Sequence, residues 1–175
     1  MSKTLIAVAA LFAVALSVSP IPQQVGSPLK DVGDLIVGEW TGEGIYAADY
    51  PGVGKKGEPF TSTHTCQWTA GEAAVACEGS GSGSTWTALY WWDAGAKQVM
   101  YVGVNSGGNY DQGTFAKKGA KLVWESSGYF ADGQPVTFKG ETIFEDDGDT
   151  QIAVGATILD GAPSEFRDIY RRVTN

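Results

Sequence analysis

Turn-forming residues recur about every dozen positions along most of this chain, and they limit the folds that it can adopt. The runs between the turns are rich in Trp, Tyr, Phe, Val, Ile and Thr, and several alternate apolar and polar residues. Short alternating runs separated by turns are typical of antiparallel strands joined by hairpins. Glycine makes up 24 of 175 residues, about twice the usual share, which suits so many turns. The sequence therefore predicts an all-β domain of nine to ten strands.

A long meander of hairpins leaves two exposed edges unless its first and last strands pair with each other. We therefore expect a single antiparallel up-and-down β-barrel. A short N-terminal helix precedes it, because Ser27 can cap a helix and Pro28 suits the first helical position. Alternation places Trp40 and Tyr46 on the inner face of the first strand. An apolar row on a later strand is also expected to face inward, and it consists of Ile152, Val154, Ala156 and Ile158.

The N-terminal segment carries Lys3 and then an apolar run, residues 5–18, that is shorter than the roughly 20 residues of a membrane-spanning helix. We interpret residues 1–17 as a signal peptide, residues 18–27 as a short disordered leader and residues 28–175 as the barrel domain. The protein is then secreted or periplasmic, with no membrane span, as a monomer or homodimer. Its net charge of −8 disfavours binding to nucleic acid or to anionic membranes, because both need a basic surface.

Cys66 and Cys77 are the only cysteines, and a turn-like segment around Gly71 lies halfway between them. A hairpin folded at that point places the two residues opposite each other on adjacent strands. Opposed residues of an antiparallel pair are close enough for a disulfide, which persists in an oxidising compartment. We therefore expect a disulfide between Cys66 and Cys77; the alternative is two unpaired small core residues.

Three short motifs carry a family resemblance. They are Gly38-Glu39-Trp40 after the predicted helix, Leu89-Tyr90-Trp91-Trp92-Asp93 in the middle of the chain, and Tyr170-Arg171-Arg172 near its end. This layout resembles the calycin barrels, among them the lipocalins and fatty-acid-binding proteins. It is most similar to lipocalin-like families of uncharacterised exported bacterial proteins, and the similarity spans about residues 29–174. The resemblance implies a barrel that can hold a ligand.

Closure of the barrel brings the first and last strands together, and Trp40 and Arg172 are the residues expected to fasten them. A guanidinium laid over an indole ring makes a cation–π contact and has donors left for nearby carbonyl groups. Alternation along the last strand points Arg172 inward and Arg171 to solvent.

Few residues suggest catalysis or the binding of a metal or cofactor. His64 is the only histidine, so a zinc site built from several imidazoles is excluded, and we assign no catalytic or metal-binding residues. The acidic segment 145–149 lacks the ligand spacing of a calcium loop and is interpreted as a hairpin turn. The segment GEWTGEGIYAADYPG is similar to nitrobindin-type haem barrels, and His64 could act as an axial ligand. Those proteins ligate haem from a late histidine, which this chain lacks, so we expect no cofactor.

A barrel of this size can enclose one small ligand. We expect a non-catalytic barrel that binds a small, largely hydrophobic molecule. Two alternatives stay open: an isomerase- or cyclase-type enzyme that uses His64 and Asp168 as acid and base, and an interaction or structural module of the cell envelope. The residues predicted to contact the ligand are Tyr46, His64, Trp86, Tyr90, Tyr101, Trp124, Phe138 and Asp168.

Overall fold

The computed structural model describes residues 27–174, which begin with helix α1 (Pro28–Ile36). The Ser27 Oγ atom accepts a hydrogen bond from the Lys30 backbone N–H at 3.2 Å. Pro28 occupies the first turn, where a backbone N–H has no helical partner to lose. The start of the helix is therefore where the sequence predicts it. The proposed signal peptide and nearly all of the proposed leader lie outside the described residues.

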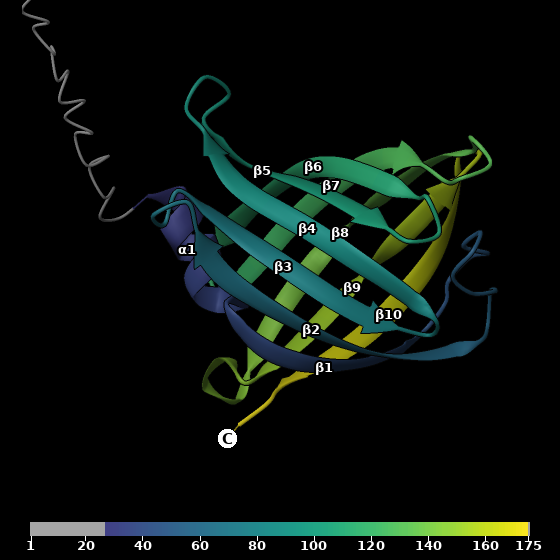
Figure 1. The fold of residues 1–175 in the computed structure, drawn as a ribbon, viewed down its shortest axis with the longest axis horizontal. Helices are drawn as coiled ribbons and strands as arrows, with labels where there is room; N and C mark the ends of the chain where they lie inside the picture. Colours follow the sequence, from purple (N-terminus) through teal and green to yellow (C-terminus); the bar gives the residue numbers. More distant parts are fainter. Residues whose placement is uncertain (1–26, 175) are drawn as a thin grey trace, which may run out of the picture.

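Ten antiparallel strands follow, and each pairs with the next along the chain. They are β1 (Gly38–Ile45), β2 (Pro59–Thr69), β3 (Ala74–Gly81), β4 (Ser84–Asp93), β5 (Gln98–Asn105), β6 (Tyr110–Lys118), β7 (Lys121–Tyr129), β8 (Pro135–Glu145), β9 (Thr150–Leu159) and β10 (Ala162–Arg172). A short 3-10 helix, η1 (Asp146–Gly148), joins β8 to β9. Because β1 also pairs with β10, the sheet closes on itself (Figure 1). The predicted up-and-down barrel with a short N-terminal helix is confirmed.

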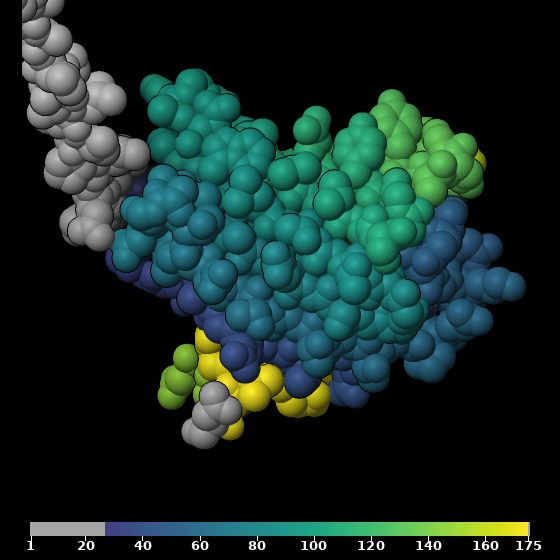
Figure 2. Space-filling view, in the orientation of Figure 1, coloured from purple at the N-terminus to yellow at the C-terminus, as the bar shows by residue number. Residues whose placement is uncertain are grey.

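The two ends of the barrel differ. Helix α1 lies across one end, where its buried face packs on interior residues that include Val75, Val99 and Leu122. The β1–β2 loop, residues 46–58, lies at the opposite end (Figure 1). Figure 2 shows this loop in blue and the β7–β8 turn, residues 130–134, in light green at that same end. One end of the interior is therefore filled by a helix, and the other is bordered only by loops.

The predicted disulfide is confirmed. Cys66 on β2 lies opposite Cys77 on β3, with 4.0 Å between their Cα atoms, and the two sulfur atoms are bonded. The connecting turn contains three residues with positive φ, Ala70, Gly71 and Glu72, which is typical of tight hairpin connections. Disulfides are characteristic of proteins that fold in oxidising compartments.

The orientation predicted for β9 is wrong. Register with β8 pairs Phe138 with Thr157 and Gly140 with Gly155, so the odd-numbered residues of β9 face inward. The apolar row expected inside lies on the outer wall instead, and it consists of Ile152, Val154, Ala156 and Ile158. At Gly140, the inner β8 position paired with Gly155, a Cβ would crowd the Val154 carbonyl oxygen and the Trp124 ring. Outside, Ile152 lies between Ile143 on β8 and Ile169 on β10, which leaves it 8% exposed.

The seam between β1 and β10 is fastened at Trp40, which is 1% exposed. Its indole N–H donates to the Ile36 carbonyl oxygen at 2.9 Å, and the Arg172 guanidinium carbon lies 4.2 Å from the centre of its ring. Arg172 also donates to the Val37 carbonyl oxygen at 2.7 Å and to the Asp149 carboxylate at 3.0 Å. The side chain occupies the space beside Gly38 that a Cβ would need. Arg172 therefore joins β10, the end of α1 and the β8–β9 connection.

We expect Arg172→Ala to lower the free energy of unfolding by about 2 kcal/mol, because it removes a cation–π contact and leaves a partly buried carbonyl without its charged donor. Arg171→Ala is the matched control. Arg171 points outward to Glu43 at 2.9 Å in an exposed ion pair, and such pairs contribute less than about 1 kcal/mol. Urea denaturation of the two variants measures the difference. Equal losses, or a larger loss for Arg171→Ala, would contradict the assignment.

Candidate functional site

A cavity of about 370 Å³ lies inside the barrel at the end opposite α1. Its walls come from residues of β2, β3, β4, β5, β6, β8 and β10 and from the β1–β2 loop. Small inward-facing residues leave the space open, among them Ser62, Gly81, Ser84 and Gly103. The cavity reaches the surface at Val104 and Tyr110, which are 52% and 43% exposed.

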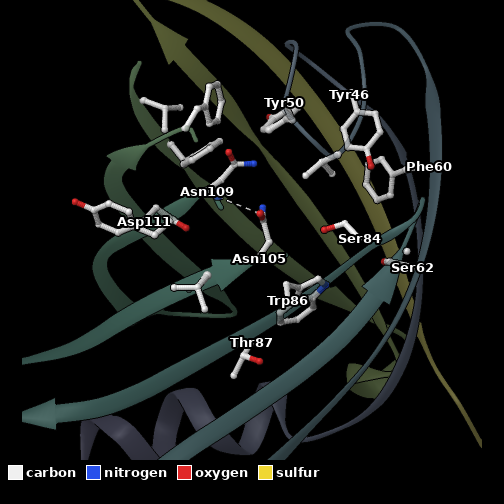
Figure 3. A pocket seen from close by; sticks show the side chains of 18 of the residues that line it. Tyr46, Tyr50, Phe60, Ser62, Ser84, Trp86, Thr87, Asn105, Asn109 and Asp111 are labelled. Atoms are coloured by element: carbon white, nitrogen blue, oxygen red, sulfur yellow. Dashed lines mark hydrogen bonds between the residues drawn. The ribbon is translucent and has the colours of Figure 1, made fainter. Parts of the chain in front are cut away.

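Aromatic rings make up much of the lining (Figure 3). The Tyr46 ring centre lies 5.4 Å from that of Tyr50 and 5.0 Å from that of Phe60. Tyr50 also stacks on Phe138 at 6.3 Å, and Trp86 on β4 faces the same space. Because aromatic faces attract both apolar groups and cations, this lining suits a guest with an apolar body.

The β1–β2 loop is held across this end of the barrel by specific contacts. The Tyr50 hydroxyl hydrogen-bonds the Thr157 hydroxyl on β9 at 2.7 Å. The Asn109 side-chain amide donates to the Pro51 carbonyl oxygen at 3.1 Å. Burial raises the pKa of Tyr50 to about 12, so its phenol stays protonated at neutral pH and can donate this hydrogen bond. The loop thus forms part of the cavity wall.

A polar group lies on the wall formed by β5 and β6. Asp111 borders the cavity and accepts a hydrogen bond from the Tyr101 hydroxyl at 3.3 Å. The register places Asp111 between Gly103 and Gly128, so no side chain from either paired position covers it. Burial raises the pKa of its carboxyl group, and hydrogen bonds from Ser126 and Tyr101 partly offset this. Asn105 also borders the cavity, and its side-chain oxygen accepts a hydrogen bond from the Asn109 backbone N–H at 3.2 Å (Figure 3).

The eight residues predicted to contact a ligand fall into two groups. Those that border the cavity are Tyr46, Trp86, Tyr101 and Phe138. The others, His64, Tyr90, Trp124 and Asp168, lie on inward-facing strand positions outside the cavity lining. Ligand contact by any of the eight stays a prediction.

Tyr90 and Trp124 help to fill the barrel interior. The Tyr90 ring centre lies 5.1 Å from that of Tyr101 and 5.1 Å from that of Phe115. Trp124 stacks on Phe166 at 6.0 Å, and its indole N–H donates to the Thr142 hydroxyl at 3.1 Å. These packed rings separate the cavity from the end that α1 covers.

His64 lies among aromatic rings, with ring-centre distances of 6.4 Å to Trp40, 5.3 Å to Trp86 and 5.5 Å to Tyr170. Its Nδ1 atom is buried and has no hydrogen-bond partner among residues 27–174. Burial lowers the pKa of the imidazole to about 4, so it is neutral at physiological pH. Aromatic rings therefore border the imidazole on several sides, and this surrounding does not favour haem ligation through His64.

Asp168 lies over Gly44 beside the Phe60 ring. Its Oδ1 atom is buried without a hydrogen-bond partner in the described part of the chain, and burial raises the pKa of the carboxyl group to about 7. The pKa shifts of His64 and Asp168 come from burial and not from each other. Within residues 27–174 no hydrogen bond or ion pair joins them, so the geometry does not favour the acid–base pair considered from sequence.

Sequence reasoning missed most of the residues that border the cavity, among them Tyr50, Asn109 and Asp111. Asp111 alternates with Gly113 and Phe115 along β6, and that pattern could have placed it inside. Tyr50 and Asn109 lie outside the strands, where alternation gives no orientation. Within the described residues, His, Cys, Asp and Glu side chains form no group of three or more that could hold a metal ion.

The fold and the site together define a closed ten-stranded barrel with an aromatic-lined internal cavity at one end. No protein-family model matches the chain, and the comparison with curated proteins gives no significant match. No helix within residues 27–174 is long and apolar enough to cross a membrane.

Proposed function

We propose that this barrel binds one small, largely apolar molecule in its cavity and carries out no covalent chemistry on it. The observation that carries the proposal is the aromatic-lined space of about 370 Å³ at one end of an otherwise packed interior. Small-molecule sites are typically pockets of this size, mainly apolar, with a few polar groups that fix orientation. Here Tyr101, Asn105 and Asp111 supply those groups.

We further propose that the chain is a calycin-like barrel of the lipocalin-like type that acts outside the cytoplasm. A short N-terminal helix, a meander that closes on itself and an Arg–Trp contact at the seam support this relationship. The disulfide between Cys66 and Cys77 supports export, because such bonds persist in oxidising compartments. An exported binding protein of this kind would carry or sequester its ligand.

The neutral fluorescent probe N-phenyl-naphthylamine tests the binding function, because its emission rises when it enters an apolar site. We expect a saturable rise with one probe bound per chain. Ser62→Phe should weaken binding about tenfold or more, because the ring would occupy space that the ligand needs. Thr63→Phe is the matched control, since this neighbour points out of the barrel and is exposed. Unsaturable emission, or equal effects of the two variants, would refute the proposal.

A further inference from the structure

We propose that the ligand of this cavity is a small organic cation with an apolar body, such as a protonated amine, and that Asp111 is its counter-ion. The inference rests on the proposed binding function and adds the chemical class of the ligand. It follows from the charges that face the cavity and from the aromatic rings around them.

The one charged side chain in the described lining of the cavity is acidic. None of the described residues in its lining is Lys, Arg or His, whereas Asp111 is part of the wall. The inward-facing Arg172 lies at the seam near α1, where Trp40, Val37 and Asp149 engage it. An anionic guest would therefore lose its hydration beside a carboxyl group with no cation to compensate, which costs several kcal/mol.

Asp111 is placed to meet a cation. Its paired positions on β5 and β7 are Gly103 and Gly128, which have no side chains to cover the carboxylate. The Tyr101 hydroxyl donates to Oδ1 from one side. A charged donor on the ligand can approach from the cavity, and hydrogen bonds of this charge-assisted kind are about twice as strong as neutral ones.

The surroundings also favour positive charge. Tyr46, Phe60 and Trp86 turn aromatic rings toward the cavity (Figure 3), and ring faces attract cations. A second carboxyl group, Asp168, lies beside Phe60, and its Oδ1 atom has no partner in the described chain. Burial raises the pKa of both carboxyl groups, and a cation nearby favours their ionised forms.

Three compounds that share one carbon skeleton test the inference: phenylbutylamine, phenylbutanol and phenylbutanoic acid. Each competes with bound N-phenyl-naphthylamine at about pH 8, where the amine is a cation and the acid an anion. We expect the amine to displace the probe at a concentration about tenfold or more below that of the alcohol, and the acid to be the weakest competitor.

The Asp111→Asn variant tests whether Asp111 is the counter-ion of the bound amine. We expect it to weaken binding of the amine about tenfold or more while changing the affinity for the alcohol less than about twofold. Asp147→Asn is the control, because it changes the net charge equally at an exposed residue of η1, away from the cavity. The comparison of the three compounds on the unaltered protein needs no variant, so a poorly folding Asp111→Asn leaves the test intact.

The outcomes separate this inference from the proposed function. If the probe itself does not bind, the binding function fails. If the probe binds but the acid competes as well as the amine, or the amine no better than the alcohol, the cavity is not selective for cations and the inference is wrong. A preference for the amine that survives unchanged in folded Asp111→Asn would refute the role of Asp111.

Discussion

Trp40→Ala is expected to lower the free energy of unfolding by about 4 kcal/mol, which is in the range for deleting a large buried aromatic side chain. Trp40 is 1% exposed, so the substitution leaves a cavity at the seam. It also removes the indole donor to the Ile36 carbonyl oxygen and the surface on which the Arg172 guanidinium lies. Equilibrium denaturation in urea measures the loss.

Trp40→Phe separates the contribution of the indole N–H from that of the buried ring. Phenylalanine keeps a ring under Arg172 and most of the buried area but has no N–H, so we expect a loss of about 1 to 2 kcal/mol. A double variant that combines Trp40→Ala with Arg172→Ala should lose less free energy of unfolding than the sum of the two single losses. The reason is that the effects of substitutions at contacting residues are not additive. Additive losses, or a Trp40→Ala variant as stable as the parent, would show that the seam does not depend on this contact.

The pH dependence of stability is expected to contain two opposing contributions from the barrel interior. Burial lowers the pKa of His64 from 6.5 to about 4, so the unfolded chain takes up a proton that the folded chain does not. This contribution makes stability rise with pH across that window. Burial raises the pKa of Asp168 from 3.8 to about 7, so the folded chain holds a proton that the unfolded chain releases. Stability from this group is lost as pH rises through that range.

Single substitutions expose each contribution. Relative to the parent, Asp168→Asn should gain about 3 kcal/mol of stability on going from pH 4 to pH 7, because the unfavourable ionisation is gone. His64→Gln should change in the opposite direction, by about 3 kcal/mol between pH 4 and pH 6.5. The measurement is the free energy of unfolding in urea at several pH values. If the stability of both variants relative to the parent changed in the same direction with pH, the burial assigned to His64 and Asp168 would be contradicted.

Tyr50 and Tyr170 are ionisable residues that interact with Asp168. Burial raises the pKa of both phenols, so they stay protonated throughout this range and add no slope of their own. His64 faces Trp40, Trp86 and Tyr170, of which only the tyrosine titrates. The two variants therefore report on one group each.

Much of the fold could be predicted because the two strands of each hairpin are close together in the sequence. The positions of Cys66 and Cys77 around a turn fix their register without any knowledge of the rest of the chain. The inward direction of Arg172 follows from alternation along a single strand. On β9 the same reasoning failed, because the inward Gly155 follows from its register with Gly140 on β8 and Phe166 on β10, which are distant in sequence.

The location of the cavity could not be predicted from the sequence. Tyr90 and Tyr101 are paired across β4 and β5 and both point inward, yet only Tyr101 borders the cavity. The difference depends on how far the residues packed beside α1 reach into the barrel and on where Tyr50 enters it. Both depend on contacts between distant segments, which neither alternation nor composition encodes. Asp111 was a different case, because its alternation with Gly113 and Phe115 along β6 could have placed it inside.

The order of pairing in this barrel has a kinetic consequence. Nine of its ten strand pairs join strands that are neighbours along the chain. The β1–β10 seam joins the two ends of the barrel instead: the Arg172 side chain donates to the carbonyl oxygen of Val37, a residue 135 positions earlier. Joining such distant segments carries the largest loop-closure entropy in the molecule. The nine sequential pairs can form from local nuclei, so we expect the seam to be the last pairing to form in folding and the first to open in unfolding. Contacts at Trp40 and Arg172 thus act mainly on the unfolding rate, and they set how long the closed barrel persists.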